Sequence, residues 1–583
     1  MKIRNKINKS DLLFIIIITF IFSILLFYNS IPREHDLLFH MNRLVGIFEG
    51  IKDHQIPVRV YPNTNNGFGY GASLFYCDFF LYPFALLYGY LNVPLIISFK
   101  IMLACIFLLT SITTLYACRK IFKKDLTIYI TSILYIFSNY HMMTTYTRMA
   151  LGEIFTMAFM PLAFLAIYQI LKEHKDSYLL LGISFSCILM SHLLSFSLCC
   201  FLFIIFIIYF LIINIKDIKI IKKAFFTTLK GTILAIILSA AFFFPMLEQI
   251  FTGTYFFEFP YFYDVLNPKY IFSFFTTNSV GVEFFSTISL GLPLLIIPIF
   301  SLFKKNKLNI FLFVINIILI LIIYDILSIS SLKYSMSLQF SFRLFIIVTP
   351  IASYLVGNVL DEFESRNLIN ILSIIILLVS IINIVKMTID YKPYYLDGFV
   401  YYSNTSSVDE LFDMSDSIKE DVIFNIKEIS GGEYLPPTEF TDYLNDTKAI
   451  KKYINEYEWV DVILEPKDDY YNEILCYSKD YSHITFTYDS NESEQLLLPQ
   501  TYYKGYQVYL IEEGWTKLDT YTLPHYYQVT FTTIPGLHNY ICFYKGTTIQ
   551  KVSEVCSALG IIFLFINQFL KRRKIKHDNS LNS

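Results

Sequence analysis

Long apolar runs separated by short basic connections are the feature that most constrains the fold of this 583-residue chain. A run of about 20 apolar residues is long enough to cross a bilayer as a helix. Hydrophobic residues make up 55% of the sequence and charged residues only 16%, whereas a soluble domain has about a quarter charged residues. The composition therefore predicts a polytopic α-helical membrane protein.

Twelve runs are predicted to span the membrane. Their approximate bounds are 11–28, 93–118, 126–146, 151–171, 177–190, 193–213, 229–247, 287–303, 308–327, 343–359, 367–386 and 554–570. Four cations precede the first run, which places the N-terminus in the cytoplasm by the positive-inside rule. Every second connection is then cytoplasmic, and most of these connections carry lysine or arginine clusters. The basic tail after the last run is predicted to be cytoplasmic as well.

The stretch 74–91 is apolar enough to suggest a further crossing, but a thirteenth span would place the later basic clusters outside. Pro83 interrupts this stretch, which is also rich in tyrosine. Both features are typical of an interfacial or re-entrant segment. We therefore expect 74–91 to stay on the outer side.

Residues 387–553 differ in character from the runs on either side. Polar residues increase, and alternating apolar residues predict strands at 462–464, 483–488, 506–511, 526–532 and 540–544. This segment is predicted to be an extracytoplasmic β-rich domain, in which Cys476 and Cys542 could form a disulfide. The domain division is then 1–386 (transmembrane, with a first outer loop at 29–92), 387–553, and 554–583 (last helix and tail).

The first outer loop carries an unusual density of ionisable groups next to a membrane exit, where such groups are costly and often functional. Residues 36–51 have helical spacing, and Asp36, His40 and Arg43 share one face of that helix. We expect the helix to lie on the outer surface. A carboxylate such as Asp36 can accept a proton from a hydroxyl group or ligate a divalent cation. The structural alternative is that Asp36 only caps the helix.

Further candidates lie at the predicted outer ends of the spans. Arg148 and Arg343 are suited to phosphate because a guanidinium group binds oxygens as a planar fork. Glu153 lies close to Arg148 in sequence, so the alternative for these two residues is a structural ion pair. The alternative for Arg343 is that it only anchors a span. His192, in another outer turn, is interpreted as a packing residue. His35 and His40 are interpreted as solvated or hydrogen-bonding groups near the substrate rather than as metal ligands.

The run HDLLFHMNRLVGIFEGIKDHQIPVRVYPNTNNGFGYGASLFY resembles the first outer loop of bacterial membrane proteins of the GT-C glycosyltransferase type. These proteins are often labelled 6-pyruvoyl-tetrahydropterin synthase-related membrane proteins and are similar to the YfhO-like family. The resemblance continues through short segments in the expected order, and thus covers nearly the whole chain. These segments are 148–153, 338–343, 432–436 and 503–506.

The resemblance implies a GT-C-like fold that takes a sugar from a polyprenyl-phosphate carrier at the outer face of the bacterial plasma membrane. The acceptor would be an envelope glycan or lipid. In such enzymes an acidic residue of the first outer loop is essential, and Asp36 matches it. Some GT-C families have a paired Asp-Glu there, but Leu37 follows Asp36 in this chain. That departure puts a metal requirement in doubt. The soluble pterin enzyme needs a histidine-rich zinc site, and the sequence has no histidine triad with such spacing.

Two other classes of function fit the sequence. A transporter or flippase of lipid-linked glycans would need ionisable residues at midplane depth and internal repeats, and neither is evident. A non-catalytic envelope scaffold would tolerate substitution of Asp36 but not of residues 387–553. A nucleic-acid partner is not expected, because the lysines are dispersed over short loops.

Overall fold

The computed structural model describes residues 8–581 apart from 29–30, 33–35, 66, 147, 254, 256–265, 267, 269–270, 272–287, 305, 329–337, 339, 364–365, 390–400, 403–449, 456–457, 463–473, 513 and 524–525. The chain divides into two compact units. One consists of Met1–Leu37, Pro94–Ser239 and Phe259–Ser407, and the other of Leu38–Val93, Ala240–Glu258 and Val408–Ser583.

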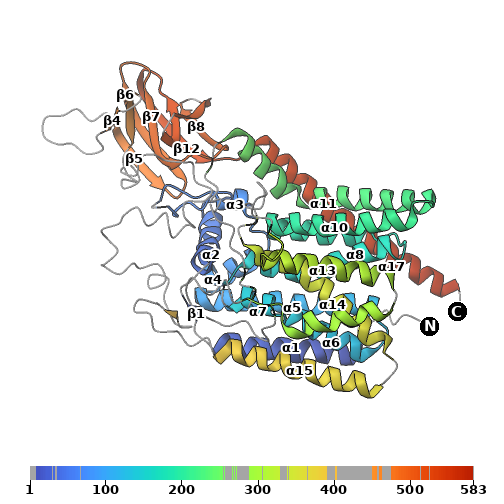
Figure 1. Ribbon diagram of the computed structural model, residues 1–583. Helices are drawn as coiled ribbons and strands as arrows, with labels where there is room; N and C mark the ends of the chain where they lie inside the picture. The colour runs from blue at the N-terminus through green and yellow to red at the C-terminus, as the bar shows by residue number, and fades with distance from the viewer. Residues whose placement is uncertain are drawn as a thin grey trace. The chain divides into compact units, whose positions relative to one another are not determined.

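The first unit is a bundle of apolar helices, several of which run side by side in Figure 1. Its elements are α1 (Lys9–Tyr28), α5 (Leu95–Ile121), α6 (Asp125–Ile136), α7 (Asn139–Tyr146), α8 (Leu151–Leu171), α9 (Tyr178–Ser191), α10 (Leu193–Asn214), most of α11 (Ile218–Thr252), α12 (Leu292–Ile296), η3 (Ile297–Lys304), α13 (Lys307–Ile323), η5 (Ser341–Leu344), α14 (Phe345–Glu362) and α15 (Arg366–Ile389). The short strands β1 (Ile31–Pro32) and β2 (Tyr401–Tyr402) pair antiparallel.

The described part of the chain contains seven helices that are long and apolar enough to cross a membrane. They correspond to seven of the twelve runs in the sequence. The other five runs correspond to shorter apolar helices of 10–17 residues. The prediction of a helical membrane protein is confirmed, and the count of twelve crossings stays a prediction.

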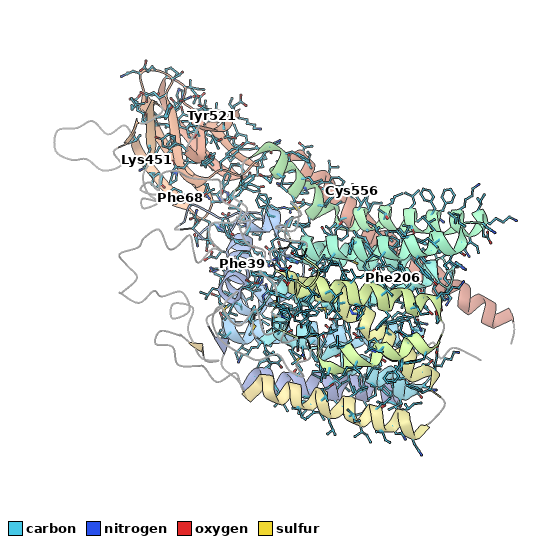
Figure 2. All side chains as sticks on the ribbon, in the orientation of Figure 1. Phe39, Phe68, Phe206, Lys451, Tyr521 and Cys556 are labelled. Carbon is cyan, nitrogen blue, oxygen red and sulfur yellow. The ribbon has the colours of Figure 1, made fainter. Side chains whose placement is uncertain are left out.

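The centre of the bundle is formed by α8 and α14. In the most apolar 18-residue stretch of each helix, 83% of the residues of α8 and 89% of those of α14 are buried, compared with 28% in α1. Phe206 of α10 is buried against Phe164 of α8, with the ring planes at 89° and the centroids 5.6 Å apart (Figure 2). Pro161 lies inside α8 and leaves the carbonyl of Met157 without its helical donor. The hydroxyl of Tyr135 donates to that carbonyl at 2.8 Å, so α6 supplies the hydrogen bond that Pro161 cannot make.

The run 126–146, predicted as one span, is two helices. Helix α6 ends at Ile136 and α7 begins at Asn139. Ser138 lies between them, and its hydroxyl accepts a hydrogen bond from the backbone of His141 at 3.4 Å. Serine is a favoured N-cap residue, so the polar pair Ser138-Asn139 starts a new helix inside an otherwise apolar run.

The second unit contains two five-stranded antiparallel sheets. The strands are β3 (Lys451–Asn455), β4 (Glu458–Asp461), β5 (Ile474–Asp480), β6 (His483–Ser490), β7 (Gln495–Thr501), β8 (Tyr506–Ile511), β9 (Trp515–Leu518), β10 (Thr520–Leu523), β11 (Tyr526–Thr532) and β12 (Gly536–Tyr544). The sheet orders are β10-β11-β7-β3-β4 and β5-β6-β12-β8-β9. Phe486 and Tyr540 of one sheet contact Phe531 of the other, so the sheets pack face to face around an aromatic core.

The predicted β-rich region is therefore confirmed. Strands β6, β8 and β11 begin at the predicted residues, and 540–544 is the second half of the longer β12. The predicted strand at 462–464 is wrong at its start, because β4 already ends at Asp461; residues 463–464 lie outside the described residues. Cys476 and Cys542 are free thiols. They lie on β5 and β12, which pair with opposite edges of β6, so a whole strand separates them.

The second unit also contains nearly all of the first loop. Helix α2 (Leu37–Lys52) matches the predicted helix, whereas the stretch 74–91 forms only α3 (Ala72–Phe75) and α4 (Tyr82–Gly89). Neither short helix has the length to cross a bilayer. Helix α17 (Thr548–Leu581) follows the sheets and contains the last candidate span.

Candidate functional site

Four of the residues predicted from sequence come together in the first unit. Asp36 precedes α2, Arg148 lies between α7 and α8, Glu153 is in the first turn of α8, and Arg343 is in η5. The backbone N–H of Asp36 donates to the carbonyl of Arg148 at 3.3 Å. The backbone of the candidate acid itself is thus bound to the α7–α8 turn.

Glu153 is the centre of this group. Its Oε2 accepts from Nη1 of Arg148 at 2.8 Å, and its Oε1 accepts from Nε of Arg343 at 3.0 Å. The hydroxyl of Tyr140 donates to Oε2 at 2.6 Å. Glu153, Arg148 and Arg343 are 2%, 4% and 8% exposed. One buried carboxylate therefore holds two guanidinium groups, from segments nearly 200 residues apart, in fixed positions.

The turn that presents Arg148 has an unusual backbone. Met149 has a φ of 52°, a left-handed conformation that is uncommon for a residue with a side chain. Hydrogen bonds from the N–H of Arg148 to Met143 and from the N–H of Ala150 to Thr144 close the turn. Conformations of this kind are often found at functional sites, where the surrounding structure holds them in place.

Aromatic rings support both guanidinium groups. The carbon Cζ of Arg148 lies 5.0 Å from the ring centroid of Phe342, and Cζ of Arg343 lies 5.2 Å from that of Phe340. Cation–π contacts of this length stabilise a positive charge without neutralising it. The segment 340–343 thus supplies one arginine of the site and the rings that position both.

Asp36 is half-buried, and the charges of Arg148, Glu153 and Arg343 all affect the pKa of its carboxyl group. Burial raises the pKa of its carboxyl group, Arg148 and Arg343 oppose that effect and Glu153 adds to it, and the net result is a raised pKa. Burial disfavours the charged form of Arg148, but the nearby carboxylates of Glu153 and Asp36 outweigh that effect and raise the pKa of the guanidinium group. The four side chains sum to zero charge when Asp36 is ionised and to one positive charge when it is protonated.

Two members of the site were missed. Tyr140 was not singled out from the sequence, and His192 was interpreted as a packing residue. His192 lies between α9 and α10, with Nδ1 2.7 Å from Oγ of Ser195, and it interacts electrostatically with Arg343, Glu153 and Arg148. Burial lowers the pKa of His192 to about 4, which keeps its imidazole neutral. Its place in a predicted outer turn was a signal, but the sequence does not show which outer turns meet.

His40 lies in the second unit, in a different cluster. Its Nδ1 is 3.1 Å from Nη1 of Arg43, whose Nε donates to Oδ1 of Asp78 at 2.9 Å. The hydroxyl of Tyr61 donates to the other oxygen of Asp78 at 2.6 Å. His40 and Arg43 are each 1% exposed, so of the two interpretations of His40, a solvated or a hydrogen-bonding group, the structure shows the hydrogen-bonding one. His35, the other predicted histidine, lies outside the described residues.

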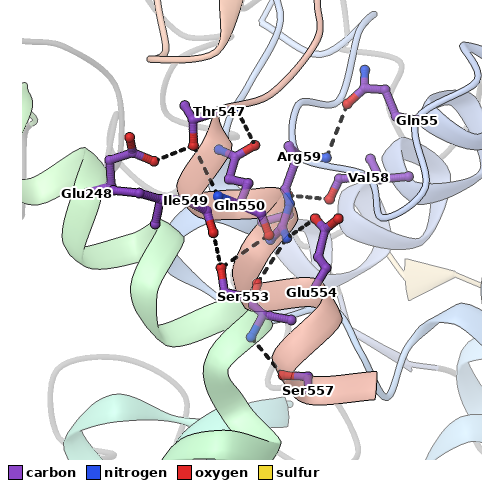
Figure 3. A network of polar contacts seen from close by, with 12 residues as sticks. Gln55, Val58, Arg59, Glu248, Thr547, Ile549, Gln550, Ser553, Glu554 and Ser557 are labelled. Atoms are coloured by element: carbon purple, nitrogen blue, oxygen red, sulfur yellow. Dashed lines mark hydrogen bonds and ion pairs between the residues drawn. The ribbon is translucent and has the colours of Figure 1, made fainter. Parts of the chain in front are cut away.

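A further polar network in the second unit joins the first loop to α11 and α17 (Figure 3). Nη2 of Arg59 donates to the carbonyl of Ala241 at 2.9 Å and to Oε1 of Glu554 at 2.7 Å. Pro245, inside α11, lacks the N–H that would otherwise bond the carbonyl of Ala241. Arg59 therefore satisfies a carbonyl that proline leaves open.

The described residues around Asp36 do not form a metal-binding set. Arg148 and Arg343 already supply positive charge beside the carboxylates, and among the described residues no three His, Cys, Asp or Glu side chains group to hold an ion. The donor set therefore suits an anionic ligand better than a divalent cation.

Fold and site together define a polytopic helical membrane protein with a buried arginine-carboxylate site and a β-rich C-terminal region. Residues 74–391, more than half of the chain, match the 6-pyruvoyl-tetrahydropterin synthase related domain of membrane proteins. The chain belongs to this family.

A comparison with curated proteins finds no match. Among solved structures, the chain is similar to a cryo-EM structure of the arabinofuranosyltransferase AftD from Mycobacteria, with 12% sequence identity and a TM-score of 0.43. The match covers 65% of this chain and 28% of that one, so the chain corresponds to little more than a quarter of its length.

Proposed function

We propose that this chain is a membrane glycosyltransferase that transfers a sugar from a polyprenyl-phosphate carrier to an envelope glycan or lipid. The observation that carries the proposal is the meeting of Asp36, Arg148 and Arg343 around Glu153. A half-buried carboxyl group with a raised pKa beside two guanidinium groups suits a reaction that moves a proton and releases a phosphate.

In the proposed reaction, the acceptor hydroxyl attacks the anomeric carbon of the donor sugar and gives its proton to Asp36. The bond between that carbon and the phosphate oxygen breaks, and polyprenyl phosphate leaves with one more negative charge than the donor carried. Arg148 and Arg343 stabilise this developing charge, which is the role for which fixed cations are most effective. The single displacement inverts the configuration of the anomeric carbon.

Glu153 has a positioning role in this proposal. It holds both arginines in place and offsets part of their charge until the phosphate arrives. A purely structural ion cluster is the alternative, but a buried ion pair is weak evidence for stability, because apolar side chains of similar volume often serve as well. The raised pKa of Asp36 and the left-handed turn at Met149 favour a functional role.

The proposal includes a topology. Twelve helices would cross the bacterial plasma membrane, with both termini in the cytoplasm and residues 387–553 outside. The site residues lie before α2, between α7 and α8, and before α14, and the charge pattern of the sequence assigns these connections to the outer face. The carrier would then enter from the outer leaflet.

The test is sugar transfer in membranes that contain the protein and a polyprenyl-phosphate hexose. Asp36→Asn should abolish transfer at unchanged protein level, because it removes the proton acceptor. Asp325→Asn is the matched control, since this carboxylate follows α13, is exposed and should be dispensable. Unchanged transfer by Asp36→Asn contradicts the proposal, and carrier movement across the bilayer without transfer identifies a flippase.

A further inference from the structure

One sheet of the second unit has an outer face with a mixed aromatic and polar character. Along β6, Ile484, Phe486 and Tyr488 are buried in the sandwich, and Thr485 and Thr487 alternate with them on the other face. Strand β12 follows the same pattern. The outer face therefore contains the odd-numbered residues of β6 and β12, with the residues paired to them on β8 and β9.

Trp515 is the prominent side chain of this face. It is 58% exposed, although large aromatic side chains are usually well buried. Its ring lies 5.6 Å from that of Tyr509 at 52° and 6.2 Å from that of Phe543 at 68°. The indole is thus held by two other rings while much of its surface stays open to solvent.

An isoleucine and then two polar side chains continue the row in which Trp515 lies. Trp515 pairs with Ile511, Ile511 with Asn539, and Asn539 with Thr487. Paired residues share a face of the sheet, so these four side chains form a line across four strands, a distance of about 14 Å. The hydroxyl of Thr487 donates to Oδ1 of Asn539, which directs the amide of Asn539 within the row.

We infer that this face binds a chain of neutral pyranose sugars, with one sugar stacked on Trp515 and others hydrogen-bonded to Asn539 and Thr487. A pyranose ring has an apolar C–H face and a rim of hydroxyls, which match an aromatic ring followed by hydroxyl and amide groups. The exposed charges on the face have both signs, with Asp480 and Lys517 among them, which favours a neutral ligand over a polyanion. The inference rests on the proposed function in taking this glycan as the acceptor.

A lipid surface is the other ligand for an exposed tryptophan. A face that binds lipid presents a broad apolar surface with basic residues around it. Here hydroxyl and amide side chains interrupt the apolar residues within the same row. The observations therefore favour the sugar chain, and a lipid surface becomes an outcome of the test.

The chain has two tryptophans, so fluorescence can test the inference in the purified full-length protein. Trp459→Phe leaves Trp515 as the sole tryptophan, and Trp515→Phe leaves Trp459, which lies on β4 of the other sheet. Excitation at wavelengths longer than those that tyrosine absorbs selects the tryptophan emission. Hexasaccharides of glucose, mannose and galactose are the probes. At least one of these hexasaccharides should cause a saturable change in the emission of the Trp459→Phe variant. None of them should change the emission of the Trp515→Phe variant. Removing the side chains of Thr487 and Asn539 together should weaken binding by about tenfold.

No emission change with any of the three hexasaccharides overturns the inference. A change with phosphatidylglycerol vesicles alone overturns it in favour of lipid contact. Asp36→Asn separates this inference from the proposed function, because that variant should lose transfer and keep the fluorescence response. If Asp36→Asn still transfers sugar and keeps the fluorescence response, only the proposed function fails. If Asp36→Asn loses transfer but the unsubstituted protein shows no fluorescence response either, only the glycan face fails.

Discussion

The contact between Arg59 and the carbonyl of Ala241 predicts a specific energetic coupling to Pro245. Arg59→Met removes the only donor shown for this carbonyl among the described residues, and the carbonyl is left unsatisfied. Pro245→Ala restores a backbone N–H that can make the ordinary helical bond to Ala241. In the alanine background the loss of Arg59 should therefore matter less. The double mutant should be more stable than the sum of the two single effects predicts.

The magnitude follows from the chemistry of the contact. A hydrogen bond to a charged donor contributes about 1.5–3 kcal/mol, and this is the part that Pro245→Ala makes redundant. The ion pair of Arg59 with Glu554 is lost in both backgrounds and cancels in the cycle. Since the Glu554 side chain is 31% exposed, we assign that pair only about 0–1 kcal/mol.

The assay is the free energy of unfolding in mixed micelles titrated with SDS, measured for the protein with Arg59 and Pro245, both single variants and the double variant. We expect a coupling of about 1.5–3 kcal/mol. Independent sites add to within about 0.5 kcal/mol, so a coupling below that value would refute the reasoning. Ser557→Ala is a suitable comparison, since its hydroxyl accepts from the N–H of Ala241 and should not couple to Arg59 through the carbonyl.

Three further predictions follow from other contacts. The hydrogen bond to Asp53 raises the pKa of His483 above 6.5, so the stabilisation of the fold by this pair is present at low pH and is lost as the pH rises through the raised pKa. His483→Asn should therefore lower the melting temperature more at about pH 5.5 than at about pH 9. An equal effect at both pH values would contradict this prediction. Glu153→Gln leaves two buried guanidinium groups without their carboxylate, and should cost about 3–5 kcal/mol of stability. Lys175 is exposed and its partner Glu173 is partly exposed, so Glu173→Gln should be tolerated. Cys476 is exposed, so an impermeant maleimide should label it in intact cells. A cysteine that replaces Ser580 should react only after permeabilisation. The opposite labelling pattern would contradict the proposed topology.

Most helices of the first unit could be predicted from the sequence because burial in a bilayer or a bundle demands long apolar runs. The break between α6 and α7 could not be predicted from hydropathy, since it depends on Ser138 as a local cap. Strands β6, β8 and β11 were predictable because their apolar residues alternate. Strand β9 was not, because most of its residues are exposed and give no alternating signal.

The candidate site was predictable in part, for a physical reason. Arg148, Glu153 and Arg343 stand out as charges at the ends of apolar runs, where desolvation demands a partner or a function. Tyr140 carries no such signal, since a tyrosine at a helix end is common in membrane proteins. The pairing of Arg43 with Asp78 depends on how the loop closes through space, which residue spacing does not show. For the same reason, the sequence does not show that His40 and Arg43 lie beside Asp78.

The central claim is that Asp36 accepts the proton while Arg148 and Arg343 bind the donor phosphate. The most direct measurement is the single-turnover rate of sugar transfer as a function of donor concentration, in purified protein with Asp36→Asn. We predict that the maximal rate falls by about 10²–10⁴-fold, the usual contribution of a general base, with the half-saturating donor concentration unchanged. An unchanged maximal rate, or a loss confined to donor affinity, would contradict the account.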